Sequence, residues 1–125
     1  MLLFAAAVVI GSQACRPCHS AIANSYAQTP MARSSGPIKS ISLTPANFTA
    51  AGHRYQVSKN QLSLKEAGAE IIVPMSFFIG SGAAGRSFLF ARDRYLFELP
   101  VAWYARKNRW DASPGYESEP GVKLN

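Results

Sequence analysis

The sequence predicts an α+β fold, in which one N-terminal helix is followed by a small antiparallel β-meander. Residues 15–28 are rich in Ala and place Ile22 and Tyr26 four positions apart, the spacing of one helix face. From residue 53 onward apolar and polar residues alternate, which is typical of strands. With 125 residues, of which 48% are hydrophobic, the chain has the length and composition of one globular domain.

The helix and the segment after it can be delimited from turn-forming residues. Pro30 is expected to end the helix, because proline cannot continue it and restricts the residue before it. Residues 31–50 are rich in Ser, Pro, Thr and Gly and are expected to form a loop, with one short strand over residues 38–43.

The predicted meander begins with a hairpin whose turn is Lys59-Asn60, between the alternating pairs at 55–57 and 62–64. A second β-rich run covers residues 70–79, with Pro74 at an edge or bulge, and residues 80–85 form a Gly-rich turn. The strongest hairpin signal is the turn Asp93-Arg94, which joins a strand through Phe88 and Phe90 to the alternating residues 95–103.

Three regions are expected along the chain. Residues 1–10 form an apolar leader with the length of a secretory core segment, far too short to span a membrane, and a buried first element is the alternative. Residues 11–116 are expected to form a single domain. After Trp110 the composition turns to Gly, Pro, Ser and Glu, and residues 117–125 are expected to be a polar tail.

The residues that carry chemistry are Cys15-Arg16-Pro17-Cys18-His19. Two thiols three positions apart at the start of a helix have the spacing needed to bond the two vinyl groups of a haem, and the following imidazole is then the proximal iron ligand. Zinc would need four ligands, and His53 is the only other histidine. A thiol-redox motif would follow a strand in a βαβ unit, and a disulfide between positions 15 and 18 has poor geometry. The motif therefore predicts one covalent haem c per chain.

The chain resembles a segment of the large bacterial multihaem c-type cytochromes. The resemblance covers residues 11–116, from Gly-Ser-Gln-Ala before Cys15 and Tyr-Ala-Gln-Thr-Pro-Met-Ala at 26–32 to Ile-Gly-Ser-Gly at 79–82, Leu-Pro-Val-Ala-Trp-Tyr at 99–104 and Ser-Pro-Gly-Tyr at 113–116. It implies electron transfer in the periplasm or outside the cell. Two departures are visible: no second Cys-x-x-Cys-His follows, and Ala83 and Ala84 stand where the family often has a histidine. These departures fit a single-haem relative or a truncated gene product.

A sixth iron ligand is expected, because electron transfer is fastest when the iron stays six-coordinate. Met31 lies just past the helix and is the first candidate, and His53 is the second. An open or externally supplied position is the third possibility, and Met75 is expected to be a core residue. Arg86 is the first candidate to pair with a haem propionate, because the Gly-rich turn before it allows close approach.

Charge and composition narrow the function further. The net charge is +6, yet the basic residues are scattered and no groove-reading motif is visible, so no nucleic acid is expected. The expected partners are redox proteins, other haem-bearing chains or further copies of this chain, and membrane association is left open. Electron transfer is the leading function. The alternatives are a haem enzyme with an open iron site, of peroxidase or nitrogen-oxide reductase type, and a haem-stabilised assembly module.

Overall fold

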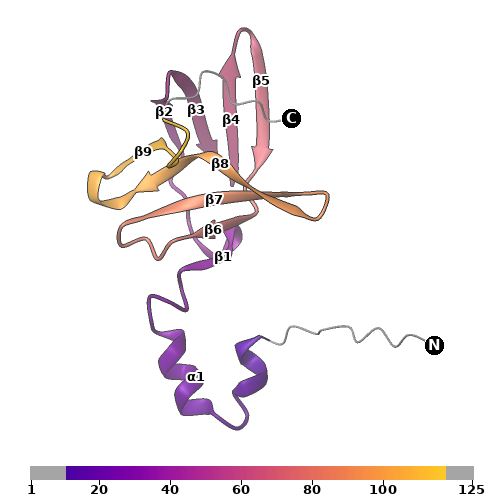
Figure 1. Ribbon diagram of the computed structural model, residues 1–125, viewed down its shortest axis with the longest axis vertical. Helices are drawn as coiled ribbons and strands as arrows, with labels where there is room; N and C mark the ends of the chain where they lie inside the picture. The colour runs from indigo at the N-terminus through magenta and orange to yellow at the C-terminus, as the bar shows by residue number, and fades with distance from the viewer. Residues whose placement is uncertain (1–10, 118–125) are drawn as a thin grey trace, which may run out of the picture. The chain divides into compact units, whose positions relative to one another are not determined.

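The computed structural model describes residues 11–117, so the expected leader and all of the expected tail except Glu117 lie outside the described residues. Contacts divide the chain into two compact units, residues 1–33 and 34–125 (Figure 1). The boundary falls inside residues 11–116, and the expectation of one cytochrome domain over that range stays a prediction. No helix in the described range is long and apolar enough to cross a membrane.

The first unit holds a 3₁₀ turn, Ser12–Cys15, and the helix α1, Ser20–Ala27. The helix is shorter than the predicted range of 15–28, because residues 16–18 form a turn around Pro17 before α1 begins. At the other end, the backbone N–H of Thr29 donates to Tyr26 O at 2.9 Å, and Pro30 follows. Proline has no N–H with which to extend the helix, so the predicted stop at Pro30 is confirmed.

The second unit consists of two antiparallel sheets (Figure 1). The five-stranded sheet has the order β1-β6-β7-β8-β9, and the four-stranded sheet has the order β2-β3-β4-β5. The strands are β1 Ser35–Pro37, β2 Ala46–Ala50, β3 His53–Ser58, β4 Gln61–Glu66, β5 Ala69–Pro74, β6 Phe77–Ile79, β7 Gly85–Arg92, β8 Tyr95–Tyr104 and β9 Arg109–Ala112.

The predicted α+β class with a single small meander is wrong. Antiparallel strands make up almost half of the described residues, and α1 is the one α-helix among them. The alternation after residue 53 indicated strands correctly, but it did not show that they divide between two sheets. The division occurs at Met75 and Ser76, between β5 and β6, where the predicted run over 70–79 breaks into two strands of different sheets.

The two hairpins expected from turn residues are confirmed. Around Lys59-Asn60, β3 and β4 pair with Ser58 opposite Gln61, and around Asp93-Arg94, β7 and β8 pair with Arg92 opposite Tyr95. All four of these turn residues have positive φ, as a two-residue type I′ turn requires. Pro74 lies at the end of the edge strand β5, where proline costs no ladder hydrogen bond, as predicted.

Two smaller expectations are wrong. Residues 38–43 were expected to form a strand, but Ile38–Ser40 is a 3₁₀ turn, and the short strand β1 precedes it. The Gly-, Pro- and Ser-rich composition after Trp110 predicts a segment with no core contacts, but β9 continues to Ala112 and Ser113 is fully buried. The hydroxyl of Ser113 donates to Leu99 O at 2.9 Å. A buried hydrogen-bonded serine cannot be told from a loop serine by composition.

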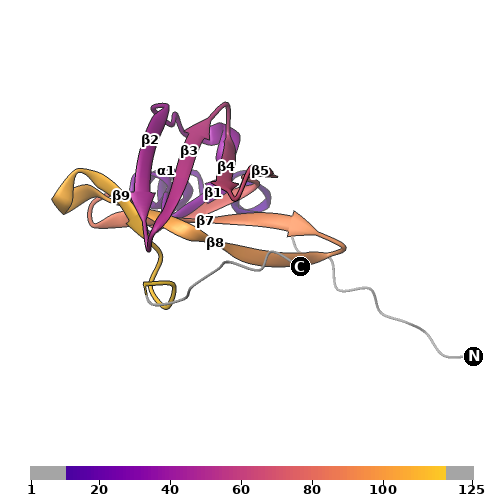
Figure 2. The same ribbon diagram turned by 90° about the horizontal axis from the view of Figure 1, so that it is seen from above.

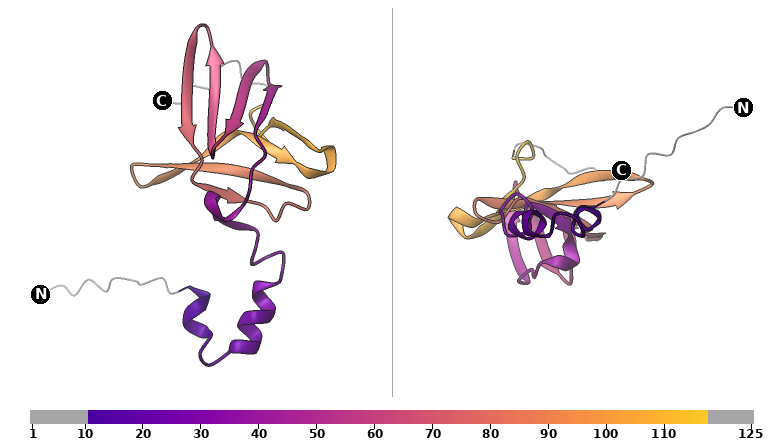
Figure 3. Two further views of the ribbon diagram at one scale, coloured as in Figure 1. Left: turned by 180° about the vertical axis from the view of Figure 1, so that it is seen from behind. Right: turned by 90° about the horizontal axis from the view of Figure 1, so that it is seen from below.

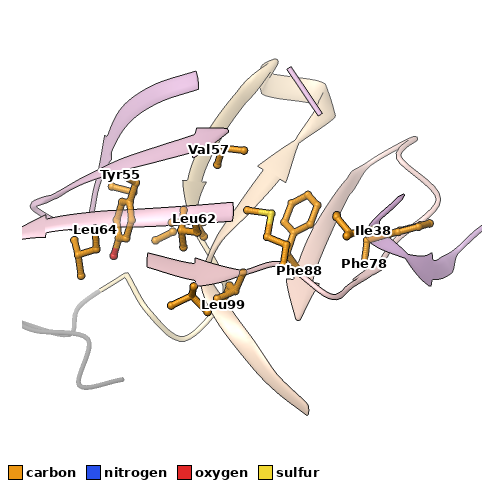
Figure 4. Close-up of a cluster of buried hydrophobic side chains, with 13 residues drawn as sticks. Ile38, Tyr55, Val57, Leu62, Leu64, Phe78, Phe88 and Leu99 are labelled. Atoms are coloured by element: carbon orange, nitrogen blue, oxygen red, sulfur yellow. The ribbon is translucent and has the colours of Figure 1, made fainter. Parts of the chain in front are cut away.

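The core lies between the two sheets (Figure 4). Each sheet contributes alternate residues: Tyr55, Val57, Leu62 and Leu64 come from the four-stranded sheet, and Phe78, Phe88, Leu99 and Val101 come from the five-stranded sheet. Met75 is 4% exposed, which confirms it as a core residue. In Figure 2 the strands of the two sheets run across one another, as in orthogonal sheet packing.

Candidate functional site

The Cys-x-x-Cys-His segment forms a single turn that leads into α1. Cys15 ends the 3₁₀ turn, and the backbone N–H of His19 donates to Cys15 O at 2.9 Å. Residues three apart in a helical turn project to the same side. Cys15 and Cys18 therefore share one side of this turn. Both are free thiols and both are exposed.

His19 immediately precedes α1, in the position that caps the helix. Its backbone is not helical, with φ −127° and ψ 47°, and its side chain makes no capping hydrogen bond. Its carbonyl accepts from the N–H of Ala23 at 2.9 Å. The main chain of His19 therefore starts the helix, while the exposed imidazole is not used to cap it.

The helical residues of the first unit lack a protein core. No residue of the 3₁₀ turn or of α1 is buried. Ile22 and Tyr26 lie on one face of α1 and are both exposed, Ile22 by 69%. A covalently held haem is a large apolar group that would cover such side chains. Two accessible thiols on one side of a turn, an adjacent imidazole and an exposed apolar helix face fit a haem c.

Met31 lies on a turn that is fixed by its neighbours. The N–H of Ala32 donates to Thr29 Oγ1 at 3.2 Å, and the N–H of Arg33 donates to Pro30 O at 3.2 Å. Arg33 also donates through Nε to Ala27 O at 3.2 Å and through its guanidinium to the side chain of Gln28. These bonds hold the turn against the end of α1. Met31 is 74% exposed on it, within the same unit as His19.

His53 is the first residue of β3 and belongs to the second unit. It pairs with Ala50, and its Nδ1 lies 3.7 Å from Glu66 Oε1. The His53 ring lies edge-on to Tyr55, with 6.3 Å between the ring centroids. Its side chain is only 11% exposed. The structure therefore surrounds His53 with groups from its own sheet.

Arg86 holds the Gly-rich loop that precedes it. Its Nε donates to Gly80 O at 3.3 Å, and its Nη2 donates to Ser81 O at 3.2 Å. Its Cζ lies 5.2 Å from the centroid of the Phe78 ring. Gly82, with φ +91°, lies so close that a Cβ there would be 2.8 Å from Nη2. The structure thus gives Arg86 a loop-stabilising role, and its pairing with a propionate stays a prediction.

Sequence reasoning singled out Met31 but missed the residues that fix its turn. Thr29 and Arg33 carry that role, through the bonds described above. The Thr-Pro pair after the helix was the sequence signal for this turn, because a threonine hydroxyl often hydrogen-bonds to backbone groups left unpaired at a helix end.

Comparison with known proteins identifies no relative of this chain. No protein-family model, no curated protein and no solved structure matches the chain. Within residues 11–117, no three His, Cys, Asp or Glu side chains come together as a metal site of their own. The resemblance to multihaem cytochromes rests on the sequence strings given above.

Proposed function

We propose that this protein transfers electrons and carries one covalently attached haem c on its first unit. The observation that carries the proposal is the Cys15-to-His19 turn, with both thiols exposed and His19 directly beside Cys18. In the attachment, each thiol adds across one vinyl group of the haem: a sulfur–carbon bond forms, and the thiol hydrogen goes to the other vinyl carbon. A bound haem c supplies a reversible one-electron couple at its iron.

The residues of the chain hold and orient that group. His19 is proposed to provide the first iron ligand, because thioether bonds at Cys15 and Cys18 would hold the haem next to its imidazole. Met31 is proposed as the sixth ligand. Its exposure on a hydrogen-bonded turn, in the same unit as the haem motif, supports this choice. His53 is less suited to the role, because its side chain is largely covered and lies close to Glu66.

Charge and chemistry indicate the partners and the compartment. A net charge of +6 favours docking to acidic redox proteins, and contact with other haem-bearing chains or with further copies of this chain is also compatible with it. We propose a periplasmic or extracellular location, as thioether-bound haem is assembled outside the cytoplasm in the family that the sequence resembles.

The test is the mass of the denatured protein after expression together with a haem-attachment system. We expect the mass of the chain plus one haem, and haem staining that survives denaturation. The double variant Cys15→Ser/Cys18→Ser should lose both. Met31→Ala is the matched control, because it removes the proposed distal ligand and leaves the thioether bonds intact. Wild-type protein without added mass, or a double variant that keeps it, would contradict the proposal.

A further inference from the structure

The far end of the β7–β8 hairpin is a two-stranded ribbon without a third strand. β6 pairs with β7 only as far as Leu89, and β9 pairs with β8 only from Val101 onward. Residues 90–97, here called the outer hairpin, therefore pair only with each other in the sheet. Figure 3 shows this end of the hairpin reaching past the other strands of its sheet, as do Figures 1 and 2.

A break in the ladder separates the outer hairpin from the packed part of the strands. The register of β7 and β8 shifts between Ser87 and Leu89, and Pro100 lies in the same stretch of β8. Burial changes at this point: the first four residues of β8, Tyr95 to Glu98, are exposed, and the next four are buried. Bulges of this kind redirect a strand. Phe90 still packs against the core, and the N–H of Ala91 donates to Ser76 Oγ at 3.1 Å. Beyond these two residues the outer hairpin projects from the core.

The outer hairpin carries large apolar side chains on both faces. Phe90 stacks on Phe97 with centroids 5.1 Å apart, and Tyr95 lies 6.4 Å from Phe97, all three on one face. Leu96, opposite Ala91, projects to the other face. Tyr95 is 68% exposed and Leu96 is 57% exposed. Contiguous exposed apolar groups mark a binding surface.

The presence of apolar side chains on both faces of the outer hairpin decides what kind of partner fits. A protein surface would cover one face of a ribbon and leave the other in water. Immersion in a lipid interface covers both faces at once. Beyond Ala91 the backbone edges of the ribbon pair with no third strand, which excludes the hydrocarbon centre, where such groups find no hydrogen-bond partner. Tyr95 at the tip is suited to the headgroup level of a membrane, because its apolar ring can contact lipid there while its hydroxyl stays hydrated.

The charges at the tip indicate the sign of that lipid surface. The turn carries two arginines and one aspartate, and Arg92 Nε lies 3.4 Å from Asp93 Oδ2. Arg94 has no ion-pair partner among residues 11–117. The outer hairpin therefore has one excess positive charge on a chain of net charge +6. Basic residues beside interfacial apolar ones favour anionic lipid headgroups.

We propose that the outer hairpin inserts shallowly into the interface of an anionic lipid membrane and holds the protein there. The inference does not depend on the haem, because it rests only on residues of the second unit.

The experiment is flotation of the full chain with vesicles in about 0.1 M salt, where surface charge still acts over about 10 Å. The vesicles contain phosphatidylcholine with or without phosphatidylglycerol. We expect binding to the phosphatidylglycerol vesicles and a loss of about tenfold or more in partitioning for Tyr95→Ser/Leu96→Ser. Ile72→Ser is the matched control, because Ile72 is 56% exposed on the edge strand β5. Arg94→Glu should weaken binding to the anionic vesicles.

Several results would overturn the proposal. The proposal is wrong if the wild-type protein binds neither kind of vesicle, or if the Tyr95→Ser/Leu96→Ser variant binds as well as wild type. Equal binding to the neutral vesicles would refute the anionic-lipid assignment. A dimer in sedimentation that is lost in the double variant would assign the surface to a second copy. Circular dichroism of the double variant should match wild type, because both residues are exposed.

Discussion

The ring of Phe48 stacks on the indole of Trp110, with centroids 5.6 Å apart and planes 13° apart. Phe48 belongs to β2 of the four-stranded sheet, and Trp110 belongs to β9 at the edge of the five-stranded sheet. Trp110 also lies 5.0 Å from the fully buried Phe88, measured between ring centroids. One tryptophan thus joins the two sheets at the corner where β2 and β9 meet.

Trp110→Ala should destabilise the second unit by about 3 kcal/mol, because it removes the aromatic contacts at this corner and leaves a cavity. The free energy of unfolding in urea measures the loss. Tyr95→Ala is the control, since Tyr95 is exposed and its loss should cost no more than about 0.5 kcal/mol. Equal stability of the two variants would show that the corner does not hold the sheets together.

Ser113→Ala should cost about 1–2 kcal/mol, although it changes one atom. Ser113 is fully buried and its hydroxyl donates to Leu99 O, so the alanine variant leaves a buried carbonyl without this donor. Urea unfolding again gives the value. Ser81→Ala provides a comparison, because the Ser81 hydroxyl accepts a longer, exposed bond of 3.4 Å from the N–H of Ala83. A Ser113 variant as stable as the Ser81 variant would refute the assigned role.

The ionised carboxylate of Asp111 should stabilise the fold, and this contribution to the free energy of unfolding should be lost in acid. The N–H of Ala112 donates to Asp111 Oδ1 at 2.9 Å, and this bond, together with Arg109 at the other oxygen, lowers the pKa of the carboxyl group in the folded chain. Because the folded pKa is below the unfolded value of about 3.9, the stabilisation is complete above that value. It is lost as the pH falls through the folded pKa.

The difference in unfolding free energy between wild type and Asp111→Asn should therefore shrink as the pH is lowered through this range. Arg109→Gln is the matched control, because it keeps the larger contribution from the Ala112 N–H and should retain most of the pH dependence. A pH-independent difference for Asp111→Asn would show that the carboxyl group gains nothing from folding.

Local features of the second unit were predictable because they depend on neighbouring residues. The turns at Lys59-Asn60 and Asp93-Arg94 follow from the alternating strands on either side of them. The division into two sheets was not predictable in this way, because it depends on which core side chains meet. Tyr55 and Phe88 both belong to runs in which a large apolar residue recurs at every second position, yet they come from opposite sheets.

At the candidate site, too, features set by neighbouring residues were predictable from the sequence, and contacts between distant residues were not. Cys15, Cys18 and His19 could be proposed from spacing alone, because all the residues of the proposed haem attachment lie within five consecutive positions. Arg86 was chosen for its Gly-rich neighbour, and that neighbour is what it binds, through the carbonyls of Gly80 and Ser81. Whether His53 is covered could not be inferred from sequence, because Glu66 approaches it from the adjacent strand β4.

The last prediction concerns the sixth iron ligand of the haem-loaded protein. Thioether ligation by Met31 would raise the reduction potential relative to two histidines, because sulfur favours reduced iron. Met31→Ala should therefore abolish the near-infrared band of ferric methionine ligation and turn the iron high-spin. The Met31 variant should also take up carbon monoxide, whereas a six-coordinate wild type should resist it. Since Met31 is 74% exposed, the fold should not change.

His53→Ala is the matched comparison for Met31→Ala. The His53 side chain packs against Tyr55 and lies near Glu66, so its removal should lower stability and leave the band and the potential as in wild type. A high-spin His53 variant beside an unchanged Met31 variant would make His53 the ligand. Unchanged spectra for both variants would assign the sixth position to a second chain or a small molecule. A wild-type protein that binds carbon monoxide readily would indicate an open iron site, and the haem-enzyme alternative would then replace the electron carrier.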